Sequence, residues 1–126
     1  LLQADELVVA VRIPKLKEGE RDFFWKVGTR RAQAISKTVL AARARMNGET
    51  IEAISIGVGS VAPTVIRAPQ TERLLTGATL TSALVEQARQ RMAKEVTPIS
   101  DLRSTEHYRR IVTGNVLVKF LRQLLG

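Results

Sequence analysis

The feature that most restricts the fold of this chain is the order of two sequence patterns. The first half holds runs rich in β-branched residues, and the second half holds apolar residues at helical spacing. Strands therefore come first and helices after, without the alternation of strand and helix that builds a parallel sheet. This order predicts an α+β fold, an antiparallel sheet of three to four strands packed against about three helices.

Two extended segments are expected before residue 30. Residues 7–13 are rich in β-branched side chains and stop at Pro14, which predicts a first strand. After a polar connection, residues 21–27 carry three adjacent aromatic residues and lead into Gly28 and Thr29. The backbone freedom of glycine predicts a loop at that point.

A hairpin is expected in the middle of the chain. Residues 35–46 and 50–61 flank Asn47-Gly48-Glu49, and an Asn-Gly pair is a strong signal for a tight β-turn. The first of these segments also suits a helix, because alanine, leucine and arginine favour one. The turn and the β-branched residues of the second segment favour two antiparallel strands.

Two helices are expected next. Residues 68–75 predict a short helix closed near Gly77, and residues 81–96 predict a longer one. Thr81 or Ser82 can cap the longer helix by accepting a hydrogen bond from a free amide of its first turn. Its apolar face is predicted from four-residue spacing to contain Leu80, Leu84, Ala88 and Met92.

A third helix is expected over residues 104–125, with Ser104 as a plausible cap. The apolar residues of this segment recur at helical spacing, which predicts one buried stripe. The members of the predicted stripe are Tyr108, Ile111, Val112, Val118, Leu121 and Leu125.

Composition excludes several classes of site. The 126 residues contain no cysteine, so the chain has no disulfide, no thiolate metal ligand and no cysteine nucleophile. Hydrophobic residues make up 44% and charged residues 25%, as in one ordinary folded domain. No apolar run approaches the roughly 18 to 20 residues that span a bilayer, and we expect a cytoplasmic protein. Because a strand-like run begins so close to Leu1, residues 1–126 are interpreted as one domain of a longer polypeptide.

The positive charge is concentrated in one part of the chain. The net charge is +8 at pH 7, and residues 23–48 hold six basic residues and no acidic one. Such a segment attracts an anion: the phosphates of a cofactor, an acidic partner surface or nucleic acid. Proteins that bind single strands spread aromatic residues among the cations, whereas three of the five aromatic residues here are adjacent. We therefore expect a partner other than nucleic acid.

Residues 57–62 have the Gly-x-Gly-x-x-Ala spacing of a dinucleotide-binding loop and follow an expected strand. That motif needs a helix next, whose amino terminus holds a pyrophosphate, and an acidic residue about 20 positions further on. Residues 63–66, Pro-Thr-Val-Ile, are a poor helix start, and residues 80–83 offer no carboxylate. These glycines are interpreted as the end of a strand.

His107 is the only histidine, which excludes a site built from several histidines. It lies close to Ser104 and Asp101 in the sequence, so a Ser-His-Asp triad can be drawn on paper. Three residues within one helical turn do not present the line of contacts that such catalysis needs. Asp101 is interpreted as a partner for a nearby arginine, and His107 as a surface residue.

Residues 23–31, Phe-Phe-Trp-Lys-Val-Gly-Thr-Arg-Arg, have two readings. One is a core strand followed by a solvated loop. The other is the rim of a flavin site, where apolar surface faces the ring and a nearby cation favours its reduced, anionic form. The pattern alone leaves both readings open.

Taken in order, these features resemble the C-terminal domain of the FAD-binding subunit of molybdenum hydroxylases, the family of xanthine dehydrogenase and carbon monoxide dehydrogenase. Each motif is weak alone, and the ordered set, which covers essentially all of the chain, is specific. The motifs are Asp5-Glu6-Leu7 with Ile13-Pro14, then Lys26-Val27-Gly28 with Arg30-Arg31-Ala32 and Ala34-Ile35-Ser36, then residues 57–63 with Arg67, residues 72–75 and Gly77, and finally Pro98, Asp101, Arg103, Ser104 and Tyr108-Arg109.

The resemblance implies a division of labour. In that family the N-terminal part of the subunit holds FAD, and the C-terminal domain closes over the flavin edge. Electrons pass from a molybdopterin-binding large subunit through an iron-sulfur small subunit to FAD, and then to NAD or another acceptor. Residues 1–126 are then the C-terminal domain of an oxidoreductase subunit, without a catalytic residue or a metal ligand of their own. The implied FAD contacts are Lys26, near the flavin ring, and the loop residues Gly28, Thr29, Arg30 and Arg31.

Two other interpretations remain open from the sequence. One is a basic interaction module that binds protein or nucleic acid through residues 23–48. The other is a structural domain whose loop touches no cofactor. A steep salt dependence of binding to an oligonucleotide would support the first, whereas an FAD-binding segment encoded before Leu1 would support the flavoprotein.

Overall fold

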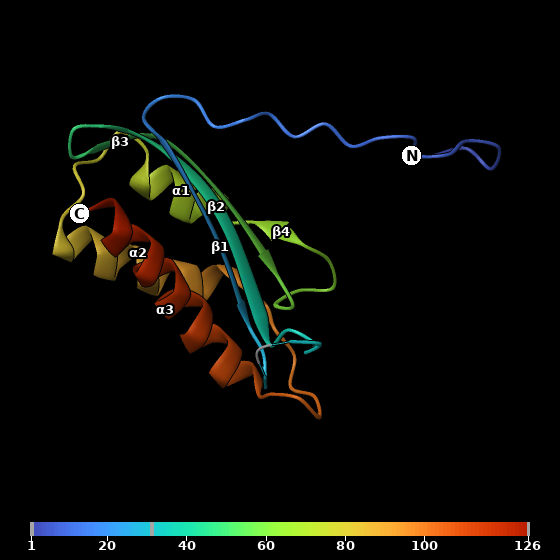
Figure 1. Ribbon diagram of the computed structural model, residues 1–126. Coiled ribbons are helices and arrows are strands. Elements are labelled where there is room, and N and C mark those ends of the chain that lie inside the picture. Colours follow the sequence, from blue (N-terminus) through green and yellow to red (C-terminus); the bar gives the residue numbers. More distant parts are fainter. Residues whose placement is uncertain (1, 31, 126) are drawn as a thin grey trace.

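The computed structural model describes residues 2–30 and 32–125, in which a four-stranded antiparallel sheet carries three helices on one face (Figure 1). The strands follow one another across the sheet in chain order, and the helices come after them. The α+β fold that the order of the sequence patterns predicted is confirmed. The elements are β1 (Glu20–Val27), β2 (Thr38–Asn47), β3 (Thr50–Gly59), β4 (Ile66–Arg67), α1 (Pro69–Leu75), α2 (Ser82–Glu95) and α3 (Glu106–Leu124).

β2 and β3 form the long hairpin that was expected around Gly48. Asn47 pairs with Thr50, so Gly48 and Glu49 alone make the turn. The φ angle of Gly48 is 57°, a conformation that glycine adopts without steric cost. β2 is a strand rather than the alternative helix because it pairs along its length with β1 on one side and β3 on the other.

The core lies between the sheet and the helices. Side chains alternate between the two faces of a strand, and the positions of β2 and β3 that point toward the helices carry the apolar residues. α1 and α2 contribute one fully buried large side chain each, and α3 contributes three. The fully buried large hydrophobic side chains of these strands and helices are Leu40, Ile51, Ile56, Val58, Leu75, Met92, Leu117, Phe120 and Leu121.

Threonine side chains cap both long helices. The hydroxyl of Thr81 accepts a hydrogen bond of 3.2 Å from the amide of Leu84, as expected for α2. The cap of α3 is Thr105 rather than the predicted Ser104, because the hydroxyl of Thr105 accepts a hydrogen bond of 3.2 Å from the amide of Tyr108. α3 therefore begins two residues later than predicted, at Glu106.

The apolar stripe predicted for α3 is right for half of its members: Leu121 is buried, and Val112 and Val118 are partly buried against the core. Tyr108, Ile111 and Leu125 are 41 to 44% exposed, and only Leu121 of the predicted set is fully buried. The buried face of α3 instead contains Arg109, Thr113, Gly114, Val116, Leu117, Phe120 and Leu121. Helical spacing detects apolar positions, and it misses buried polar residues whose partners come from distant parts of the chain.

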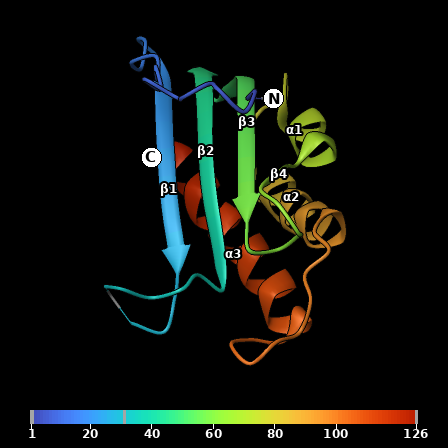
Figure 2. The ribbon, with the colours of Figure 1, turned by 90° about the vertical axis from the view of Figure 1, so that its right-hand side faces the viewer.

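Residues 7–13 do not form the predicted strand. They belong to a segment, residues 2–17, that extends away from the body on the side of the sheet without helices (Figures 1 and 2). Val9 is 95% exposed and Val11 is 78% exposed. β-branched residues favour an extended backbone, but a strand also needs partners for its amides and carbonyls. Among the described residues, no strand lies beside this segment to supply them.

Candidate functional site

β1 divides its aromatic residues between the two faces of the sheet. Phe23 is buried and stacks on Phe120 of α3, with 5.2 Å between the ring centroids. Trp25 lies on the same side, its ring stacked 6.3 Å from that of Phe23. Because side chains alternate along a strand, Phe24 and Lys26 face away from the helices. Phe24 is 67% exposed there, so the helix-free face of the sheet carries an open aromatic ring next to a cation.

Small residues occupy the middle of the helix-free face, which is turned toward the viewer in Figure 2. Across the four strands, one row of paired residues contains Phe24, Ala41, Gly57 and Arg67. The neighbouring row contains Asp22, Arg43 and Ser55. A shallow groove of about 380 Å³ runs over these two rows. Its flat floor can accept a planar ring or another layer of polypeptide.

The loop after β1 forms a second groove, of about 590 Å³, next to Lys26. The candidate residues that the structure brings together in its wall are Lys26, Gly28, Thr29 and Arg30. Lys26, Thr29 and Arg30 are exposed, and Gly28 is half-buried. The fifth candidate, Arg31, lies outside the described residues. The described candidates therefore share one open groove whose cations are accessible.

α3 is bonded to the base of this loop. The amide of Lys37 donates to the carbonyl of Val27 at 2.7 Å and closes the loop. Arg109 of α3 donates to the carbonyl of Lys37 at 3.0 Å, and the hydroxyl of Thr113 lies 2.8 Å from that of Thr38. We call Val27, Lys37 and Thr38 the loop neck. The sequence patterns did not indicate these contacts, which join residues more than 70 positions apart.

Arg109 is a buried cation, 5% exposed. Besides Lys37, it donates to the carbonyl of Ser60 at 2.7 Å and to the carboxylate of Asp101 at 2.8 Å. The backbone amide of Arg103 and the guanidinium of Arg109 hold the pKa of Asp101 below its ordinary value. The interpretation of Asp101 as the partner of an arginine is confirmed, and the partner that bonds it most closely is this buried one.

The two motifs that were set aside do not form sites. At Gly59 a Cβ would lie 2.7 Å from a methyl carbon of Val39, and residues 60–64 are bends rather than a helix. The glycines therefore end a strand, as interpreted. His107 is exposed in the first turn of α3, and the carboxylate of Asp101 bonds arginine.

The basic segment, residues 23–48, is partly neutralised by acids from outside it. Arg45 bonds Glu52 across the hairpin at 2.7 Å. Arg43 lies 3.9 Å from Glu20, at the start of β1. Two of the five cations of this segment that the structure describes therefore have a carboxylate nearby, which weakens the case for a bare cationic surface.

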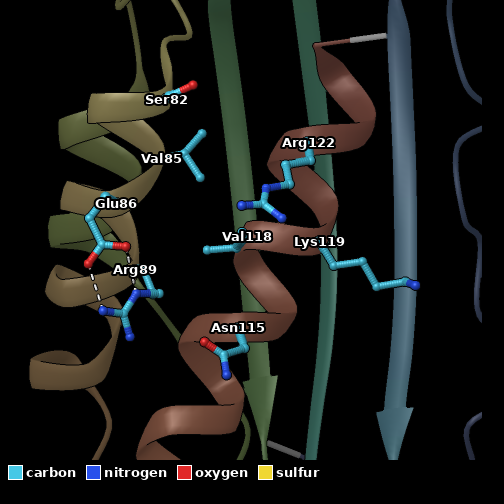
Figure 3. Close-up of a pocket in the computed structure, with 8 residues that line it drawn as sticks. All are labelled: Ser82, Val85, Glu86, Arg89, Asn115, Val118, Lys119 and Arg122. Carbon is cyan, nitrogen blue, oxygen red and sulfur yellow. Dashed lines mark hydrogen bonds and ion pairs between the residues drawn. The ribbon is translucent and has the colours of Figure 1, made fainter.

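A third groove, of about 660 Å³, lies between α2 and α3 (Figure 3). Glu86 and Arg89 of α2 are bonded at 2.6 Å, and the hydrogen bond from Arg89 lowers the pKa of Glu86 to about 2. The helices approach closely at Gly114, where a Cβ would lie 3.0 Å from the backbone oxygen of Arg89. This groove is on the helical side of the molecule, away from the loop groove.

Within residues 2–30 and 32–125, no three histidine, cysteine, aspartate or glutamate side chains gather as a metal site. Over the same residues, the helices are too short or too polar to cross a membrane.

Comparison with known proteins gives the family. The model of the CO dehydrogenase flavoprotein C-terminal domain matches residues 23–124. Because this match takes in most of the chain, the chain belongs to that family. The glyceraldehyde dehydrogenase medium chain of Sulfolobus acidocaldarius is 29% identical over 119 residues, 94% of this chain. The carbon monoxide dehydrogenase medium chain of Hydrogenophaga pseudoflava is 26% identical over 121 residues, 96% of this chain. The chain spans 42% of the length of each of these relatives.

Solved structures share the fold. A structure of carbon monoxide dehydrogenase from Hydrogenophaga pseudoflava that lacks the Mo-pyranopterin moiety superposes with a TM-score of 0.79 at 26% identity. The superposition covers 85% of this chain and 37% of that one. Quinoline 2-oxidoreductase from Pseudomonas putida 86 has the same fold, with a TM-score of 0.75 at 17% identity, over 83% of this chain and 36% of that one. The resemblance seen in the sequence motifs is confirmed for the family and for the fold.

Proposed function

We propose that residues 1–126 are the C-terminal domain of an FAD-binding medium subunit and that this domain closes over the flavin edge. The observation that carries the proposal is the position of Lys26 beside Phe24 on the helix-free face, next to the loop groove. An exposed ring and an accessible cation suit the edge of a flavin, whose reduced form is anionic. Membership of a flavoprotein family supports this assignment.

The residues present fit the ring of FAD and do not fit its pyrophosphate. Ala41 and Gly57 leave the floor of the helix-free face flat enough for a planar group. The glycines of residues 57–62 are not followed by the helix that a pyrophosphate loop requires. We therefore assign the phosphates to the N-terminal part of the subunit. The residues assigned here to the edge of the ring are Lys26, Gly28, Thr29, Arg30 and Arg31.

The partners of the domain follow from the same proposal. When bound, FAD supplies the two-electron chemistry that connects one-electron iron-sulfur carriers with an acceptor. We propose a small subunit with the iron-sulfur clusters, a large subunit with molybdopterin, and NAD as the acceptor, as in a xanthine dehydrogenase-like enzyme. In this arrangement the domain holds a positive charge near the ring and shields it from water, and it is not catalytic alone.

A bulky residue on the helix-free face tests the proposal. Ala41 is exposed beside Phe24 in the middle of the sheet, so Ala41→Trp fills the floor of the groove while leaving the core unchanged. In the full-length subunit, we expect the affinity for FAD to fall about tenfold, which is about 1.4 kcal/mol. The measurement is a titration of the apo-subunit with FAD, followed by flavin fluorescence.

The matched control is Gln87→Trp, which adds the same ring to an exposed position of α2 on the helical side. This variant should bind FAD as the unmodified subunit does. Circular dichroism checks that both variants are folded. A folded Ala41→Trp subunit with unchanged FAD affinity would show that the helix-free face does not adjoin the flavin.

A further inference from the structure

Arg109 joins α3 to the loop neck, and we infer that it is a positioning residue for the flavin-side loop, acting through Lys26. This inference rests on the proposed function. Lys26 and Val27 are the last two residues of β1, and they pair with Val39 and Thr38 of β2. The position of Lys26 therefore depends on how firmly the neck is held.

The contacts of Arg109 tie three separate segments together. Its acceptors are the carbonyl of Lys37 in the neck, the carbonyl of Ser60 after β3 and the carboxylate of Asp101. Ser60 has a φ angle of 63°, which is unfavourable for a residue with a side chain, so its carbonyl is held in a strained position. Burying a guanidinium is costly unless it is well bonded. These bonds offset the free-energy cost of burying the guanidinium only while the three segments keep their positions.

Lysine cannot reproduce this arrangement. The guanidinium is a planar fork whose donors point in fixed, separate directions, whereas an ammonium group is a compact point charge on a flexible stem. Nη1 of Arg109 donates to the carbonyls of Lys37 and Ser60, and Nη2 donates to the carboxylate of Asp101, at distances of 2.7 to 3.0 Å. Arg109→Lys therefore keeps the buried charge and loosens the neck.

A second set of contacts from the same turns of α3 ends on the same neck. Thr113 donates to the carbonyl of Arg109 at 2.7 Å, so the hydroxyl of Thr38 is the donor in the bond of 2.8 Å between the two threonines. The ammonium of Lys37 lies 5.1 Å from the centre of the Tyr108 ring, within reach of a cation–π contact. Lys37 and Thr38 of the neck thus both contact α3, and Lys37 also bonds Val27.

The expected consequence concerns the charge at Lys26. Electrostatic energy falls with distance, so a neck that shifts relative to the sheet changes the separation between the Lys26 ammonium and the flavin. Lys26→Met removes the charge and should lower the flavin midpoint potential. Arg109→Lys, which lets the ammonium of Lys26 move away from the ring, should lower it by a smaller amount. Because this substitution conserves charge, a direct electrostatic effect of residue 109 would not produce the shift.

The neighbouring Arg110 provides a matched control. Its guanidinium also donates to two backbone carbonyls, those of Ala93 at 3.2 Å and Val96 at 2.6 Å, but these lie at the end of α2. Arg110→Lys therefore makes the same chemical change one residue away and leaves the neck untouched. The flavin potential of this variant should equal that of the unmodified subunit.

A double-mutant cycle in the full-length, FAD-loaded subunit decides the matter. Midpoint potentials are measured for Lys26→Met, Arg109→Lys, the double variant and Arg110→Lys. If Arg109 acts through Lys26, the double variant has the potential of Lys26→Met alone. Full additivity of the two shifts, or an unchanged potential in Arg109→Lys, overturns the inference while the Lys26 shift still upholds the proposed function. An unchanged potential in Lys26→Met overturns both.

Asp101→Asn gives a second reading if Arg109→Lys does not fold. The substitution keeps an oxygen acceptor for Arg109 and removes its opposing charge, on a side chain that is 29% exposed. The flavin midpoint potential of the Asp101→Asn subunit should also fall. In a subunit that already carries Lys26→Met, Asp101→Asn should cause no further fall. A folded Asp101→Asn subunit whose potential is unchanged overturns the inference.

Discussion

At the residue scale, the alternation of side chains along β1 determines which residues lie on each face of the sheet. Phe23 goes into the core, while Phe24 and Lys26 go to the helix-free face. The sequence located the aromatic and basic residues correctly on a strand and a loop. It did not divide them between two faces, because that division depends on which face α3 covers. The bonds from Arg109 to the carbonyls of Ser60 and Lys37 were not predicted either, since these acceptors lie 49 and 72 positions away in the sequence.

Lys26→Met should lower the FAD midpoint potential of the full-length subunit. A unit charge about 4 Å from the ring is worth about 4 kcal/mol at an effective dielectric constant near 20, and solvent reduces this to about 1 to 2 kcal/mol. At about 30 mV per 1.4 kcal/mol for a two-electron couple, the potential falls by about 20 to 45 mV. Spectroelectrochemical titration measures the change.

Lys119→Met is the control for this prediction. The ammonium of Lys119 lies 4.1 Å from the centre of the Trp25 ring, on the helical side of β1. Removing it deletes the same charge from the opposite face and should leave the potential unchanged. Equal shifts in the two variants would mean that general charge, rather than the helix-free face, sets the flavin potential.

At the element scale, the caps of α3 give a direct test of the helix boundary. Thr105→Ala should lower the free energy of unfolding by about 1 kcal/mol, because it removes the acceptor of the Tyr108 amide. Ser104→Ala should change it little, since the backbone of Ser104, rather than its side chain, makes the hydrogen bonds that the structure gives for this residue. Urea denaturation of the chain measures both. A larger loss of unfolding free energy in Ser104→Ala than in Thr105→Ala would show that Ser104, as first predicted, caps the helix.

The elements that the sequence predicted well are those fixed by local chemistry. The β2–β3 hairpin follows from a glycine that the turn requires, and α2 follows from the threonine at its start. The predictions that were wrong depend on distant partners. Residues 7–13 have the composition of a strand, but no other strand in residues 2–30 and 32–125 lies beside them. α3 buries polar residues that bond the loop neck. Local patterns do not contain that information.

At the scale of the whole molecule, the two faces of the sheet differ. The helices cover one face of the sheet (Figures 1 and 2). The other face has a shallow groove, an exposed phenylalanine and accessible cations. Residues 2–17 leave the body on this second side. A domain that spans 42% of its relatives' length can place this face against the rest of a subunit. Under our proposal, that contact contains the flavin.

The most direct test is a crystal structure of the full-length subunit with FAD bound. The central claim predicts the isoalloxazine ring on the helix-free side of the sheet, with Phe24 or Lys26 in van der Waals contact at about 4 Å. A ring that lies in the groove between α2 and α3, or that touches no residue of β1 or of the loop after it, would contradict the claim.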